Sequence, residues 1–105
     1  MLEKEIEKKL VVGVRKIGGV AYKFVSPGND GVPDRMVCLP GGSVVFAEIK
    51  TEVGKLSSRQ KIQIKKLQAL GFDVRTLFGA ADVEEFLEEI THQVENFEKL
   101  AGRLR

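Results

Sequence analysis

The apolar residues of this 105-residue chain recur with two different spacings, and each spacing predicts one kind of secondary structure. Apolar residues three and four apart are typical of one face of a helix, whereas runs rich in β-branched and aromatic residues are typical of strands. Glycine and proline clusters between them are typical of turns. We therefore predict helices over residues 2–17, 57–70 and 79 onward, and strands over residues 20–25, 35–39, 43–50 and 72–78.

The order of these elements predicts an α/β fold with a small mixed sheet flanked by helices. Pro40-Gly41-Gly42 joins the second and third strands and predicts a hairpin. The fourth strand follows a helix, and a parallel strand pair needs such a crossover. We expect the domain to be complete over residues 1–90, with residues 91–105 forming a C-terminal helical extension.

An apolar seam runs along the last predicted helix. Its members alternate by four and three positions over three heptads, a spacing typical of a helix that packs against another helix. Part of the seam must pack on the domain. The remainder predicts a dimer contact or, alternatively, a helix folded back on its own domain. The seam consists of Val83, Leu87, Ile90, Val94, Phe97, Ala101 and Leu104.

Composition and charge narrow the class of protein. Hydrophobic residues make up 43% of the chain and charged residues 30%, and no apolar run approaches the ~20 residues that a membrane helix needs. The charged N-terminus does not fit a signal peptide, so we expect a cytoplasmic protein with no membrane partner. Net charge is only +2, yet residues 50–66 are basic and residues 82–98 acidic. This distribution predicts either two surfaces with different partners or a mixed solvated surface.

Charged residues interrupt the apolar strand at residues 43–50. Glu48 and Lys50 are two residues apart, so they project from the same face of the strand as Phe46. Both faces are otherwise apolar, which is typical of a strand covered on both sides. A carboxylate in such a strand costs free energy unless a cation or hydrogen bonds compensate it. Lys50 is one possible partner, and a bound metal ion is another.

The position of Asp34 relative to this pair depends on the register of the hairpin. With a two-residue turn at Gly41-Gly42, Asp34 lies opposite Ile49 and points away from Glu48. With a three-residue loop, Asp34 joins the face of Glu48. A site containing both carboxylates therefore predicts an odd-length loop or an irregular backbone at Val32-Pro33-Asp34, which the proline favours.

Two neighbouring carboxylates and a backbone carbonyl form the oxygen-rich ligand set that Mg²⁺ prefers. Such an ion activates water and stabilises a phosphodiester under attack, and a lysine beside it positions the water. By spacing alone, however, an ion pair at a strand end is the simpler explanation for Asp34, Glu48 and Lys50.

Several longer motifs surround these three residues and occur in a definite order. With them, the chain resembles the VRR-NUC branch of the PD-(D/E)XK nucleases from its N-terminal helix to about residue 90. The resemblance implies a restriction-endonuclease-like core of order αβββαβ, here with an added C-terminal helix, in agreement with the predicted elements. The motifs are KFVSPGNDGVPDR over residues 23–35, LPGG over 39–42, VVFAEIK over 44–50 and GKLSSRQ over 54–60.

The resemblance implies a metal site and a catalytic lysine. Asp34 and Glu48 correspond to the two metal-binding acids, and the backbone carbonyl of Ile49 corresponds to a third ligand. Lys50 corresponds to the catalytic lysine. The implied cofactor is Mg²⁺ or Mn²⁺.

Two further side chains belong to the same implied site. Gln60, in LSSRQ, corresponds to the family's glutamine on the helix that follows the site. A glutamate of the first helix is also part of the family pattern, whose spacing favours Glu3 and leaves Glu7 as the reserve choice. The alternative is that these glutamates belong only to the solvated surface.

Four residues near the implied site are candidates for contact with nucleic acid. Lys23 and Ser26 flank the loop before Asp34 and, alternatively, are an exposed strand lysine and a turn serine. Lys55 and Arg59 belong to the basic segment that follows the site. Contacts of this kind neutralise phosphates without reading sequence.

The resemblance implies a metal-dependent, structure-selective DNA endonuclease, acting as a homodimer on branched or four-way (Holliday) junction DNA in a bacterial or phage-infected cell. Two sites related by a two-fold axis suit symmetric cleavage of a junction. One alternative is a general DNA nickase or restriction-like nuclease with the same chemistry. Another is a non-catalytic nucleic-acid-binding module on a nuclease scaffold, and a third is a structural dimer whose charges are only solvated.

Overall fold

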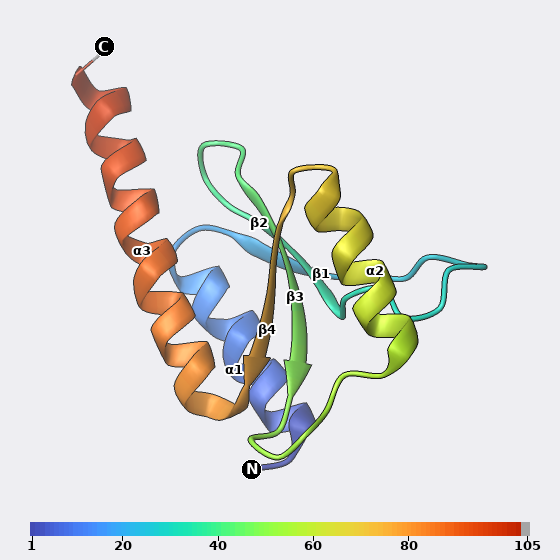
Figure 1. Cartoon of the computed structure of the whole chain (residues 1–105). Helices are drawn as coiled ribbons and strands as arrows, with labels where there is room; N and C mark the ends of the chain where they lie inside the picture. Colours follow the sequence, from blue (N-terminus) through green and yellow to red (C-terminus); the bar gives the residue numbers. More distant parts are fainter. Residues whose placement is uncertain (104–105) are drawn as a thin grey trace.

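The computed structural model describes residues 1–103, and these residues form three helices and four strands in the predicted order (Figure 1). The agreement with the sequence pattern extends to every element, with boundaries that differ by a few residues. The elements are α1 (Glu3–Lys16), β1 (Val20–Lys23), β2 (Arg35–Cys38), β3 (Val44–Lys50), α2 (Ser58–Ala69), β4 (Asp73–Phe78) and α3 (Gly79–Arg103).

The four strands form one mixed sheet in the order β1-β2-β3-β4. β1 and β2 pair antiparallel, as do β2 and β3, whereas β3 and β4 pair parallel through the crossover helix α2. Figure 1 shows α1 and α3 on one side of the sheet and α2 on the other. The predicted α/β fold with a mixed sheet is therefore confirmed, and β3 lies in its interior with a neighbouring strand on each side.

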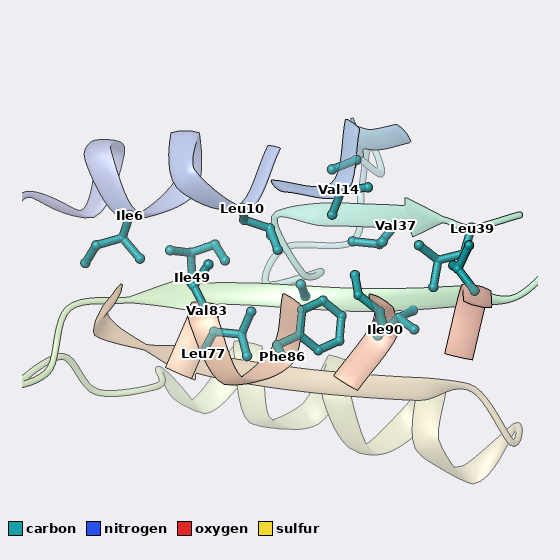
Figure 2. Packing of buried hydrophobic residues seen from close by; sticks show 14 residues of the cluster. Ile6, Leu10, Val14, Val37, Leu39, Ile49, Leu77, Val83, Phe86 and Ile90 are labelled. Carbon is teal, nitrogen blue, oxygen red and sulfur yellow. The ribbon is translucent and has the colours of Figure 1, made fainter. Parts of the chain in front are cut away.

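The larger part of the core lies between the sheet and the helix pair α1 and α3. Ile6, Leu10 and Val14 recur every four residues along α1 and are fully buried here, and these side chains point from α1 toward the sheet (Figure 2). Gly13 allows α1 and α3 to approach closely, because a Cβ at this position would collide with the side chain of Leu87. This packing places the first turns of α1 at the end of the sheet where β3 ends (Figure 1).

A smaller apolar cluster lies between the sheet and α2. Phe46 is its central residue on β3, and it packs edge-on against Phe72 with ring centroids 5.5 Å apart. Ile64 of α2 and Val74 of β4 are buried beside it. Since side chains alternate along a strand, Glu48 and Lys50 project toward this same side, just beyond the apolar cluster.

α3 continues without a break through residue 90 and projects beyond the rest of the molecule at its C-terminal end (Figure 1). Val94 is buried in the core, so this member of the seam packs on its own domain. Phe97 contacts the hairpin turn at Gly41, and Leu100 is 57% exposed. The boundary near residue 90 stays a prediction, and the last member of the seam, Leu104, lies outside the described residues.

None of the helices formed by residues 1–103 combines the length and hydrophobicity that crossing a membrane requires.

Candidate active site

The register of the hairpin places Asp34 opposite Glu48. β2 and β3 pair residues whose numbers sum to 82, as in Arg35 opposite Ala47. The loop is Pro40-Gly41-Gly42, closed by a bond from the Leu39 N–H to the Ser43 carbonyl at 2.9 Å. Gly41 has a φ of 96°, as the third position of a type II turn requires. The odd-length loop that a two-carboxylate site predicted is therefore confirmed.

Pro33 interrupts the hydrogen-bond pattern between the chain before β2 and the end of β3, next to Asp34. Leu39 and Ser43 are a hydrogen-bonded pair, and such pairs recur every second residue, so Ile49 would exchange its two bonds with residue 33. Residue 33 is a buried proline without an N–H, so it cannot donate to the Ile49 carbonyl. The Ile49 N–H donates instead to Asp34 Oδ2 at 2.8 Å. The proline thus leaves the Ile49 carbonyl without a donor from residue 33, while the bond from the Ile49 N–H orients the Asp34 carboxylate.

Glu48 is the most unusual side chain of the core, because it is a carboxylate that is only 2% exposed. Its Oε2 accepts a hydrogen bond from Gln60 Nε2 at 2.8 Å and lies 3.6 Å from Lys50 Nζ. Its Oε1 is buried and has no hydrogen-bond partner within residues 1–103. A buried polar atom without a partner costs free energy and calls for an explanation such as a bound ion.

Both carboxyl groups have a raised pKa, and burial is the largest cause for each. Burial raises the pKa of Glu48 to about 7, and the neighbouring charge of Asp34 contributes in the same direction. Lys50 lowers the pKa of Glu48, but not enough to offset burial. Burial also raises the pKa of Asp34, against the opposing effect of the bond from the Ile49 N–H. Opposed carboxylates with perturbed pKa values are typical of functional sites, and a cation between them would relieve the repulsion.

Gln60 joins this site to the start of α2. Ser57 is the N-cap of α2, and its hydroxyl accepts from the Gln60 backbone N–H at 3.1 Å. Gln60 Oε1 in turn accepts from the Ser57 N–H at 2.8 Å, which completes a capping box. With Oε1 occupied in this way, the NH₂ group faces Glu48. The Ser-x-x-Gln spacing of Ser57 and Gln60 is the sequence signature of this box.

The two glutamates of α1 differ in their surroundings. Glu7 Oε2 accepts from Arg35 Nε at 2.7 Å, and Arg35 Nη1 also donates to the Ala21 carbonyl at 3.1 Å. Glu3 is exposed and has no side-chain hydrogen bond or ion pair within the described part of the chain. The charge of Glu7 acts on Asp34, and the charge of Glu3 acts on Glu48. The free carboxylate favours Glu3 over Glu7, and the choice between them stays a prediction. Arg35 has no local sequence signal and was not anticipated.

The four candidate nucleic-acid contacts lie around the site rather than within it. Lys23 and Lys55 are exposed, and Arg59 forms an ion pair with Asp30. The hydroxyl of Ser26 accepts from the Asn29 side-chain amide at 2.9 Å, within a turn. In residues 1–103, no hydrogen bond links these four side chains to Asp34 or Glu48. Their role in binding DNA stays a prediction.

The available oxygens suit a hard divalent cation that keeps part of its water shell. No group of three His, Cys, Asp or Glu side chains within residues 1–103 is close enough to hold a metal ion. Asp34, Glu48 and the Ile49 carbonyl supply only part of a six-oxygen shell, and Mg²⁺ characteristically retains waters in the remaining positions. The unpartnered Glu48 Oε1 is the protein atom that best fits such an ion.

Comparisons with known proteins agree with this fold. No family model matches the chain. Over 75 residues it is 53% identical to "Putative nuclease p44" of Acyrthosiphon pisum secondary endosymbiont phage 1, a match that covers 71% of this chain and 81% of that protein. A solved structure described as "VRR_NUC domain" is similar with a TM-score of 0.76 and 25% sequence identity, over 82% of this chain and 94% of that chain.

Proposed function

We propose that this chain, which belongs to the VRR-NUC family of nucleases, hydrolyses DNA phosphodiester bonds with a divalent cation held at Asp34 and Glu48. The observation that carries the proposal is Glu48 Oε1, a buried carboxylate oxygen without a hydrogen-bond partner in residues 1–103. A simple ion pair with Lys50 does not account for it, because Lys50 Nζ lies 3.6 Å from the other oxygen.

The ligands would be Glu48 Oε1, the Asp34 carboxylate and the Ile49 carbonyl. A bound Mg²⁺ or Mn²⁺ would lower the pKa of a water molecule and stabilise negative charge on the phosphate. The burial of Glu48 excludes water from one side of the site and strengthens its electrostatic interactions. Asp34 is held by its bond from the Ile49 N–H, so its carboxylate does not need to reorganise.

The ammonium group of Lys50 is the proposed partner of the attacking water and the phosphate. Its side chain is 17% exposed, so the ammonium is near the surface where a phosphate can approach. From this position it donates a hydrogen bond to the attacking water and offsets the charge that develops on the phosphate. Gln60 donates to Glu48 Oε2 without adding charge, which keeps Glu48 oriented while Oε1 stays open. Glu3 extends the acidic environment from the first turn of α1.

The proposed substrate is branched DNA, including four-way junctions, bound by a homodimer in the cytoplasm of a bacterial or phage-infected cell. The dimer proposal is supported by the exposure of Phe97 and Leu100, which are 42% and 57% exposed on the projecting end of α3. Lys23, Ser26, Lys55 and Arg59 are proposed to contact phosphates around the site, in a salt-dependent way. A dimer would present two such sites in a symmetric arrangement.

A panel of labelled substrates tests this function. Linear, nicked, flapped and four-way DNA are incubated with wild type and with Lys50→Ala, in Mg²⁺, Mn²⁺ or EDTA. We expect cation-dependent cleavage of the branched substrates and loss of cleavage in Lys50→Ala, with Lys8→Ala as an exposed lysine control on α1. Cleavage of nicked and linear DNA at the same rate as branched DNA would favour a general nickase. Binding without cleavage under every metal would overturn the proposal in favour of a non-catalytic module.

A further inference from the structure

The loop before Asp34 packs tightly against the first turn of α2. Gly31 has a φ of 92°, which already favours glycine. A Cβ at this position would also lie 2.6 Å from the carbonyl carbon of Arg59, 2.7 Å from its oxygen and 2.8 Å from the Gln60 nitrogen. These are backbone atoms of a helix, so they cannot move aside as the end of a flexible side chain would. Any side chain at residue 31 would therefore displace the first turn of α2.

Two other contacts hold the same turn. Asp30, next to Gly31, forms an ion pair with Arg59. Ser57 and Gln60 form the capping box, with bonds of 3.1 Å and 2.8 Å. The loop thus contacts the helix start at Arg59, and the capping box fixes Gln60 within the same turn.

The position of this turn determines where the Gln60 amide points. Gln60 Oε1 is held by the Ser57 N–H, and Nε2 donates to Glu48 Oε2 at 2.8 Å. Glu48 belongs to β3, an interior strand of the sheet, so its backbone is fixed independently of α2. A displacement of the first turn of α2 would therefore be transmitted to the contact between Gln60 and Glu48.

We infer that Gly31 and Ser57 are positioning residues, which hold the Gln60 amide against Glu48 Oε2 and so leave Glu48 Oε1 as the oxygen directed into the site. Neither residue touches the carboxylates, and each acts through Gln60. The structural part of this inference stands on the contacts above. Its catalytic consequence rests on the proposed nuclease function.

Gly28 provides a matched control within the same loop. It has a φ of 82°, close to that of Gly31, but no described atom lies within 4 Å of a Cβ placed there. Gly28→Ala and Gly31→Ala therefore introduce the same backbone strain, and only Gly31→Ala pushes against α2. A glycine that served only the loop turn would give the same result in both variants.

The first test needs no catalysis. In ¹⁵N NMR spectra of the metal-free protein, we expect the side-chain NH₂ resonances of Gln60 to shift in Gly31→Ala toward those of the exposed Gln68, and to stay in place in Gly28→Ala. If the Gln60 resonances of Gly31→Ala lie where those of wild type and Gly28→Ala lie, the inference is wrong. The result of this measurement does not depend on whether the protein cleaves DNA.

The second test measures kcat and KM. We expect Gly31→Ala to lower kcat by about 10- to 100-fold, the size of loss that a displaced active-site group causes, with little change in KM. Gly28→Ala should keep the wild-type kcat. Ser57→Ala should also lower kcat, while Ser57→Thr, which retains a capping hydroxyl, should restore it.

The outcomes separate this inference from the proposed function. If wild type cuts DNA and both Gly31→Ala and Ser57→Ala cut as fast, the inference is wrong and the function stands. If wild type does not cut but the Gln60 resonances shift as expected, the function is wrong and the positioning role stands. If Gly31→Ala does not fold, the comparison of Ser57→Ala with Ser57→Thr decides.

Discussion

Gln60 donates its side-chain amide to Oε2 of Glu48 at 2.8 Å, so the two oxygens of this buried carboxylate have different partners. Oε2 is shared between Gln60 and, at 3.6 Å, the ammonium of Lys50. Oε1 has no hydrogen-bond partner within residues 1–103. This asymmetry supports the proposal that Oε2 holds the residue in place and that Oε1 binds the cation.

Replacement of Gln60 by glutamate separates its two roles. Gln60→Glu keeps an acceptor for the Ser57 N–H, and glutamate is a good residue at this position of a capping box. It also replaces the donor to Glu48 with a third carboxylate, which repels it. We expect α2 to keep its capped start, thermal stability to fall because of the repulsion, and kcat to fall by about tenfold or more. Gln63→Glu, on the same helix, is the control, and wild-type activity in Gln60→Glu would show that the amide donor is dispensable.

The raised pKa of Glu48 predicts how the stability of the metal-free protein depends on pH. The folded protein keeps the Glu48 proton up to a pH of about 7, whereas an unfolded chain releases it near the ordinary value of 4.5. Between these values the folded state binds more protons, so the free energy of unfolding falls as pH rises. The decrease amounts to roughly 3 kcal/mol at most.

Glu48→Gln cannot ionise and should escape this loss. In EDTA we expect it to be more stable than wild type at pH 8 and about equally stable near pH 4, as measured by denaturant unfolding. Glu88→Gln, an exposed acid on α3, should show no such gain. An unchanged difference between Glu48→Gln and wild type across this pH range would mean that Glu48 titrates normally in the folded state.

Pro33 is expected to matter for the cation rather than for folding alone. Pro33→Ala introduces an N–H that can complete the pair with Ile49 and occupy its carbonyl. We expect the affinity for Mn²⁺, measured by calorimetric titration, to fall by about tenfold, as for other changes that occupy or reorient a ligand. Pro40→Ala, at the opposite end of the hairpin, should bind Mn²⁺ as wild type does. Equal affinities in the two variants would remove the Ile49 carbonyl from the ligand set.

The end of α3 tests the proposed dimer. Leu100 is 57% exposed at the projecting end of the helix, so a charge there should disrupt an apolar contact without affecting the core. We expect wild type to be a dimer by light scattering and Leu100→Glu to be a monomer. Asn96→Glu adds the same charge to the same helix as a control. A monomeric wild type, or a dimer that Leu100→Glu leaves intact, would contradict the dimer proposal.

The sequence predicted the elements and the α/β fold because their signals are local. The stripe of Ile6, Leu10 and Val14 and the capping serine of α2 each lie within one element. The hairpin register was less certain, since Gly41-Gly42 is compatible with two loop lengths. Only the bond between Leu39 and Ser43 selects the one that brings Asp34 to Glu48.

Features that depend on distant contacts could not be read from the sequence. Gly31 lies 28 residues before Arg59, and nothing local distinguishes it from Gly28, which lacks such a contact. The pairing of Arg35 with Glu7 likewise depends on the packing of α1. The heptad seam of α3 predicted an apolar partner, but a periodic pattern does not specify which surface it meets. Val94 meets the core of its own domain.

DNA cleavage by Glu48→Gln, in which an amide NH₂ group replaces one carboxylate oxygen, tests the central claim most directly. Glu48→Gln keeps the size of the side chain and removes the charge that would hold the cation. Single-turnover cleavage of a labelled four-way junction in Mg²⁺ should be lost in Glu48→Gln, be lost for wild type in EDTA, and proceed normally in Glu88→Gln. Cleavage by Glu48→Gln at the wild-type rate would contradict a hydrolytic site built on this carboxylate.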